Sequence, residues 1–101
     1  MKKILLGLLL SFNTISHALS PNEMLAIVGA VKYYNESCAG INFAGVRQMN
    51  KGLKRFDMDR TPIHILQTHP MAKSGFETAQ KFGCEGTRQE AYRAGFGRYI
   101  N

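Results

Sequence analysis

The chain has 101 residues, and its 13 Lys and Arg against 7 Asp and Glu give a formal net charge of +6. A chain this short forms one small domain with a marginal core, which excludes multidomain enzymes and folds as large as a doubly wound sheet. The charge excess permits attraction to acidic polymers or anionic lipid headgroups but does not demand it, because the sequence contains no polybasic run.

The chain begins with the layout of a secretory signal peptide. Two lysines form a basic start, residues 4–10 are almost purely apolar, and Ser16 and Ala18 place small side chains before a cleavage site. The apolar run is too short for a permanent membrane anchor, which needs about 20 residues. We therefore predict a cleavable signal peptide over residues 1–18. The alternative is an N-terminal helix that stays attached and packs into the core.

Residues 19–101 are predicted to form a single small helical domain that is periplasmic or secreted. Two cysteines in an exported chain usually pair, so we predict a disulfide between Cys38 and Cys84. Closing this long loop would stabilise the fold by about 4 kcal/mol in the chain-entropy model. The competing interpretations are a free catalytic thiol or a metal-binding pair, and neither the spacing nor the neighbours of the cysteines favour them.

The first predicted helix begins at a capping box. Ser20 stands at the N-cap, Glu23 follows three residues later, and Pro21 occupies the first helical position. The helix should end near Asn35, where turn-forming residues begin, or continue through Cys38.

This helix has large apolar residues on one side and small residues on the other. The apolar side carries Met24, Ile27, Val28, Val31 and Tyr34 at helical spacing. The small side carries Ala26, Gly29, Ala30 and Tyr33. Because both sides can be packed against, we expect the helix to be central.

The second predicted helix covers residues 42–56 and separates apolar from basic side chains. Its apolar face carries Val46, Met49, Leu53 and Phe56. Its opposite face carries Arg47, Lys51, Lys54 and Arg55. Gly45 and Gly52 each weaken the helix by roughly 1 kcal/mol relative to Ala, so tertiary packing must hold it.

A charged connector over residues 57–60 precedes the remaining predicted helices. A short helix that begins at the Thr61 N-cap and ends near Gln67 would turn Ile63 and Leu66 inward.

A longer helix over about residues 70–82 should end at Gly83. Its inner face carries Ala72, Phe76 and Ala79. A second capping box, from Thr87 to Glu90, should open a last helix over about residues 88–94. Its packing residues are Ala91, Tyr92 and Phe96, and the aromatic tail beyond them is expected to fray. No stretch shows period-two alternation, so we predict an all-α bundle of four to five short helices with one disulfide.

The face formed by Arg47, Lys51, Lys54 and Arg55 is the candidate partner-binding surface. Four cations on one helix face suit an anionic partner such as lipopolysaccharide, an acidic glycan or nucleic acid. The alternative is an ordinary solvated face opposite the core. No aromatic side chains interleave with these cations, which argues against single-stranded nucleic acid.

No catalytic residue, metal site or cofactor is predicted. His64 and His69 would lie about 140° apart on a helix, and no Cys or acidic residue is spaced to complete a site with them. Residues 57–61 do not fit a calcium loop, because Pro62 replaces the required glycine.

These patterns predict a small exported binding or accessory protein of the bacterial envelope. Its partner would be an envelope protein or an anionic envelope component, held by the basic face or by the aromatic C-terminus. A periplasmic stress chaperone is the alternative, because small acid-activated chaperones of that compartment are also helical with one long-loop disulfide. A small enzyme is the third hypothesis.

Overall fold

The computed structural model describes residues 19–101, so the predicted signal peptide over residues 1–18 lies outside the described residues. The helices, in chain order, are α2 (Pro21–Ser37), α3 (Phe43–Arg55), α4 (Ile63–Leu66) and α5 (Pro70–Arg93), followed by the 3-10 turn η2 (Gly97–Tyr99). In this part of the chain the only β pairing is one isolated antiparallel bridge between Ile41 and Ile100. The prediction of a mostly helical fold is therefore confirmed for the described residues.

Helix α2 begins at the predicted capping box. The Ser20 hydroxyl accepts a hydrogen bond from the Glu23 amide at 3.2 Å, and the Glu23 carboxylate accepts one from the Ser20 amide at 3.0 Å. These two bonds satisfy amide groups that a helix start otherwise leaves without partners. The helix continues past Asn35 to Ser37, with Cys38 as its C-cap.

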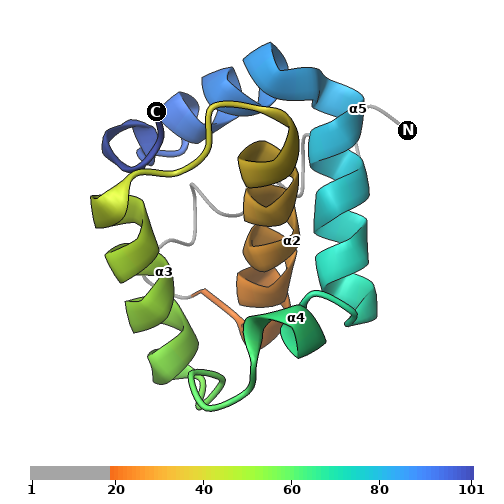
Figure 1. Ribbon diagram of the computed structural model, residues 1–101, viewed down its shortest axis with the longest axis vertical. Coiled ribbons are helices and arrows are strands. Elements are labelled where there is room, and N and C mark those ends of the chain that lie inside the picture. The colour runs from red at the N-terminus through yellow and green to blue at the C-terminus, as the bar shows by residue number, and fades with distance from the viewer. Residues whose placement is uncertain (1–18) are drawn as a thin grey trace.

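The small side of α2 packs against the first part of α5, and Figure 1 shows α2 between this part of α5 and α3. Gly29 faces the carbonyl group of Ala72, and Gly75 faces the carbonyl group of Ala26, with no room for a Cβ atom at either glycine. Ala72 is 0 % exposed. Backbones this close exclude water and maximise dispersion contacts, which places α2 in the central position that its two packable sides predict.

The apolar side of α2 contributes most of the hydrophobic core. The buried members of this core are Met24, Leu25, Val28, Leu53 and Leu66. Three residues predicted to pack inward do not: Val46 is 39 %, Ile63 40 % and Tyr92 54 % exposed. Val46 lies two turns from Leu53, beyond the core, and the single turn of α4 buries Leu66 rather than Ile63.

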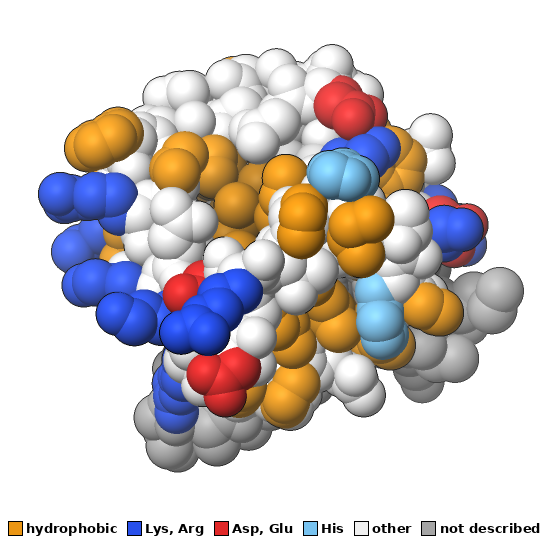
Figure 2. Space-filling view, turned by 60° about the horizontal axis from the view of Figure 1, so that its bottom comes forward, with side chains coloured by type: hydrophobic (Ala, Val, Ile, Leu, Met, Phe, Trp, Pro, Cys, Tyr) orange, Lys and Arg blue, Asp and Glu red, His pale blue; other side chains and the backbone are white. Residues whose placement is uncertain are grey.

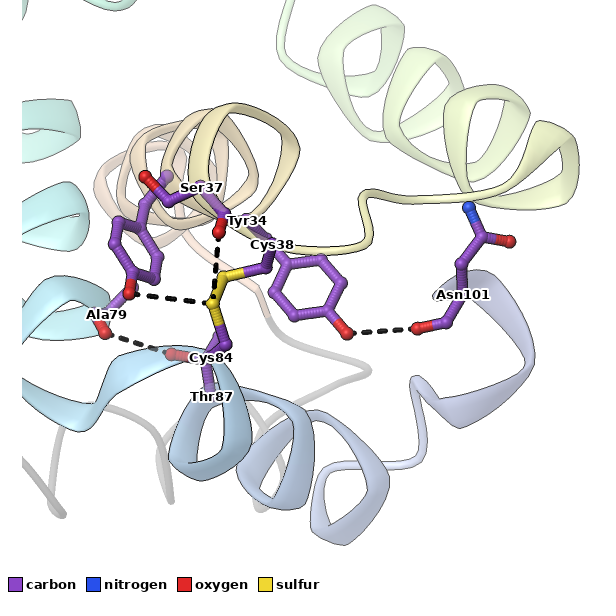
Figure 3. The surroundings of a disulfide bond; sticks show 8 residues. Tyr34, Ser37, Cys38, Ala79, Cys84, Thr87 and Asn101 are labelled. Carbon is purple, nitrogen blue, oxygen red and sulfur yellow. Dashed lines mark hydrogen bonds between the residues drawn. A yellow bond between two sulfur atoms is a disulfide. The ribbon is translucent and has the colours of Figure 1, made fainter.

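The backbone of α5 is not helical at Gly83, so two helical segments meet there at a kink, and the first of them ends where the sequence predicts. Gly83 has φ 75° and ψ 178°, a conformation that glycine adopts without a Cβ penalty, and the helix resumes at once. The predicted second capping box is therefore wrong. The Thr87 hydroxyl donates to the Ala79 carbonyl at 3.0 Å, across the bend (Figure 3). The Glu90 carboxylate accepts a hydrogen bond from Arg93 at 2.8 Å.

The disulfide joins the end of α2 to the bend in α5. Cys38 and Cys84 are bonded, with their Cα atoms 5.5 Å apart and a sequence separation of 46, as the parity of the cysteines predicts. The Cys84 sulfur lies 3.9 Å from the Tyr33 hydroxyl and 3.3 Å from the Ser37 carbonyl oxygen (Figure 3). The bond thus fixes the same two helices that the small residues bring together.

The C-terminal tail does not fray as expected, because hydrogen bonds hold it to the loop between α2 and α3. The Tyr34 hydroxyl donates to the main-chain oxygen of Asn101 at 3.0 Å (Figure 3), and the Asn101 amide donates to the Gly40 carbonyl at 2.9 Å. The Asn42 amide donates to the Tyr99 carbonyl at 2.9 Å, while its side chain donates to the Arg98 carbonyl at 2.8 Å. A terminus tied down in this way becomes part of the fold.

Candidate binding site: the basic face of α3 and the cavity behind it

Helix α3 carries the whole charge excess of residues 19–101. It holds four Lys and Arg and no acidic residue, whereas the rest of this part of the chain holds seven of each sign. Figure 2 shows the resulting gathering of Lys and Arg side chains at one side of the molecule, over α3. Because the remaining surface is balanced, the attraction of this domain for anions is concentrated on one helix.

The cations share one face of the helix with an exposed aromatic ring. At about 100° per residue, Phe43 falls within the same arc of about 120° as the predicted basic residues, all of which are exposed. These four residues, here called the basic face, are Arg47, Lys51, Lys54 and Arg55. Phe43 is 75 % exposed, and the Arg47 guanidinium lies 5.4 Å from its ring centroid. At the other end, Arg55 lies 5.7 Å from the ring of Phe56. Aromatic rings therefore flank the cations at both ends of the helix, although none lies between the cations in sequence.

Two ion pairs of the described residues lie away from Arg47, Lys51 and Lys54. Lys32 pairs with Glu36 at 3.0 Å, and Arg93 pairs with Glu90 at 2.8 Å. Within residues 19–101, Arg47, Lys51 and Lys54 have no acidic partner.

The spacing of these cations is only partly explained by helix stability. Lys54 and Arg55 lie in the last turn, where cations interact favourably with the helix dipole. Lys51, however, has Arg47 and Arg55 at the i−4 and i+4 positions, and like charges at this spacing destabilise a helix. Helix stability alone therefore does not account for a cation at position 51.

A cavity of about 370 Å³ lies behind the basic face, bounded by α2, α3, α5 and the C-terminal segment. From α2 it is lined by Ile27, Ala30 and Val31, which are only half-buried. From α5 and the C-terminal segment it is lined by Phe82 and Phe96. The walls are thus largely apolar, and they include Ala26 and Gly75 of the close contact between α2 and α5.

Two glycines hold α3 close to the rest of the fold near its two ends. A Cβ atom on Gly45 would collide with the Tyr99 carbonyl oxygen, and one on Gly52 would lie 2.6 Å from the Met24 sulfur. Between them, Gln48, Met49 and Lys51 line the cavity. The glycines that weaken α3 as a helix therefore allow its close approach, and the space lies between the two contacts.

The structure places His69 and His64 on different elements. The Nδ1 atom of His69 accepts a hydrogen bond from the Met71 amide at 3.0 Å, so this side chain caps α5, a role that the sequence analysis did not assign. His64 is exposed on α4. In residues 19–101 no three His, Cys, Asp or Glu side chains are grouped closely enough to hold a metal ion.

Arg88 on α5 has a perturbed pKa. The hydrogen bond with Tyr92 raises the pKa of Arg88 above its ordinary value. The Arg88 guanidinium lies 5.7 Å from the Tyr92 ring centroid. This residue is outside the basic face, and the shift keeps its charge fixed.

Comparisons with known proteins give no relative for this chain: no family model, curated protein or solved structure matches it. None of the helices formed by residues 19–101 has both the length and the apolar character needed to cross a membrane.

Proposed function

We propose that this chain is a small exported protein that binds an anionic surface of the bacterial envelope through the basic face of α3. The observation that carries the proposal is that the entire charge excess of residues 19–101 lies on this one exposed helix. A Lys or Arg near an anionic lipid surface contributes about 1 kcal/mol of attraction, so several acting together give measurable binding. The N-terminal pattern and the disulfide support export.

A lipid surface fits the basic face better than a small anion does. The four cations are exposed along a helix and do not converge on a single point. Phe43 adds an exposed ring at one end of this face, and Arg47 stacks on it. On a lipid surface this ring would enter the headgroup region while the cations beside it meet the phosphates.

The test is binding to vesicles of phosphatidylglycerol mixed with phosphatidylcholine, measured by co-sedimentation at rising salt concentration. We expect retention that falls with salt and disappears on vesicles of pure phosphatidylcholine. The double variant Lys51→Glu with Lys54→Glu should bind at least ten-fold more weakly. The matched control is Lys73→Glu with Lys81→Glu, which makes the same charge change at exposed positions of α5 and should lose much less.

Equal losses in the two double variants would overturn the proposal, because binding would then follow net charge and not the face of α3. Salt-independent binding to both kinds of vesicle would overturn it as well. The chaperone and enzyme hypotheses stay predictions. Dimers that dissociate in acid and expose apolar surface would favour the first, and turnover that requires a reduced cysteine would favour the second.

A further inference from the structure

The cavity behind α3 has the dimensions and lining of a ligand site. Its volume of about 370 Å³ lies near the lower end of the roughly 300–1,000 Å³ typical of pockets for small molecules. Ile27 and Val31 of α2 remain half-buried at its wall. Covering apolar side chains of this kind is favourable, so an apolar guest would gain free energy by entering.

The charged groups at this cavity favour an anionic guest. Lys51 and Arg55 line it from α3, at the edge of the basic face. Among the described residues, Glu90 is the only acidic side chain in the lining, and it is buried and bound to Arg93 at 2.8 Å. Lys51 has no acidic partner within residues 19–101. A ligand with a negative head would therefore complement Lys51 without displacing an existing ion pair.

We propose that the cavity takes the hydrocarbon chain of a single-chain carboxylate, with the head group held by Lys51 and Arg55. The inference rests on the proposed function, since the same basic face supplies the head-group contact, and it names the ligand class. One chain suits a cavity near the lower end of the ligand range better than the two chains of a phospholipid do.

The test is titration calorimetry on protein recovered from the periplasm of expressing cells, with its N-terminus read by mass spectrometry. Octanoate, decanoate and dodecanoate are the probes. We expect binding to tighten by about four-fold for each added methylene until the chain fills the cavity. Dodecyltrimethylammonium, which has a similar chain and the opposite charge, should bind at least ten-fold more weakly than dodecanoate.

Two variants fill the cavity from two different helices, so the test does not depend on one substitution folding well. Ala30→Leu adds volume from α2, and Ala91→Leu adds it from α5. Each should weaken dodecanoate binding at least ten-fold. Ala39→Leu, at an exposed position outside the cavity, should leave it unchanged. Lys51→Gln should weaken dodecanoate binding several-fold and leave binding of the uncharged dodecanol unchanged.

Full dodecanoate affinity in folded Ala30→Leu and Ala91→Leu would overturn the inference, as would equal affinity for the cationic amphiphile. Vesicle binding separates this failure from failure of the proposed function. The double variant Arg47→Glu with Lys54→Glu lies outside the cavity lining, so it should weaken vesicle binding and spare dodecanoate. Vesicle binding without dodecanoate binding sinks the inference alone, and the reverse result sinks the proposed surface alone.

Discussion

The two sides of α2 (Pro21–Ser37) are packed in different ways. Toward α5, Ala26 is buried, and neither Gly29 of α2 nor Gly75 of α5 has room for a Cβ atom. Toward α3, Ile27 and Val31 stay half-buried at the wall of a cavity. The difference shows that close backbone contact holds one side, while the other side leaves Ile27 and Val31 half-buried beside a row of cations. Substitutions in the close contact should therefore destabilise the fold, and substitutions at the cavity wall should change what the protein binds.

The largest expected effect follows removal of the disulfide. This bond lies on the side of α2 that packs closely against α5, here called the closed side; the side toward α3 is called the open side. Cys38→Ser with Cys84→Ser frees the end of α2 from the bend in α5. We expect the free energy of unfolding to fall by about 4 kcal/mol, because the unfolded chain regains the entropy of a long loop. Urea denaturation of the oxidised protein and the double variant measures this difference. A change below about 1 kcal/mol would mean that packing alone holds α2 against α5.

The same small substitution should act differently on the two sides. Gly29→Ala forces a Cβ atom into the Ala72 carbonyl group, and we expect a loss of about 3 kcal/mol because two backbones must separate.

Gly52→Ala is the matched substitution on the open side. There the new Cβ atom meets the movable end of Met24, and the gain of roughly 1 kcal/mol in helix propensity offsets much of the clash. The midpoints of urea unfolding compare the two variants. Similar losses in both would contradict the division of α2 into a closed and an open side.

A smaller effect is expected from the hydroxyl that holds the tail. Tyr34→Phe removes the bond to the main-chain oxygen of Asn101 and should cost about 1 kcal/mol. Hydrogen exchange should quicken at the amides of the tail. Tyr33→Phe is the control: its hydroxyl lies 3.9 Å from the Cys84 sulfur, a weaker contact, so its loss should be smaller. If the two variants lost equal stability, the tail would not depend on Tyr34.

The smallest expected effect concerns charge. Lys51→Gln removes like-charge contacts at the i−4 and i+4 positions of α3 and should stabilise the protein by a few tenths of a kcal/mol. Lys32→Gln breaks the pair with Glu36 and should destabilise it by a similar amount. Thermal unfolding at low salt resolves the opposite signs. If Lys51→Gln were destabilising, Lys51 would have a structural role.

Local rules predicted the start of α2 and the pairing of the cysteines. Ser20 and Glu23 act within one turn, and two cysteines leave one pairing, so neither needs knowledge of the fold. Thr87 shows where such rules stop. Its spacing to Glu90 matches a capping box, but the bend at Gly83 places its hydroxyl on the Ala79 carbonyl. The backbone conformation of Gly83 therefore decides whether the Thr87 hydroxyl caps a helix or binds the Ala79 carbonyl.

The candidate site divides in the same way. The basic face of α3 follows from helical spacing and was predicted from the sequence. The cavity was not, because it depends on where Gly45 and Gly52 bring α3 against Tyr99 and Met24, and these contacts are set by tertiary packing. A signal was present in the seven-residue spacing of the two glycines, which places both on the same side of α3, next to Met49.

The most direct measurement is hydrogen exchange of the protein with and without phosphatidylglycerol vesicles. The account predicts slower exchange along Phe43–Arg55 when vesicles are present and little change over residues 70–82, on the closed side. Slowing that is confined to residues 70–82, or that is equal over both segments, would contradict it.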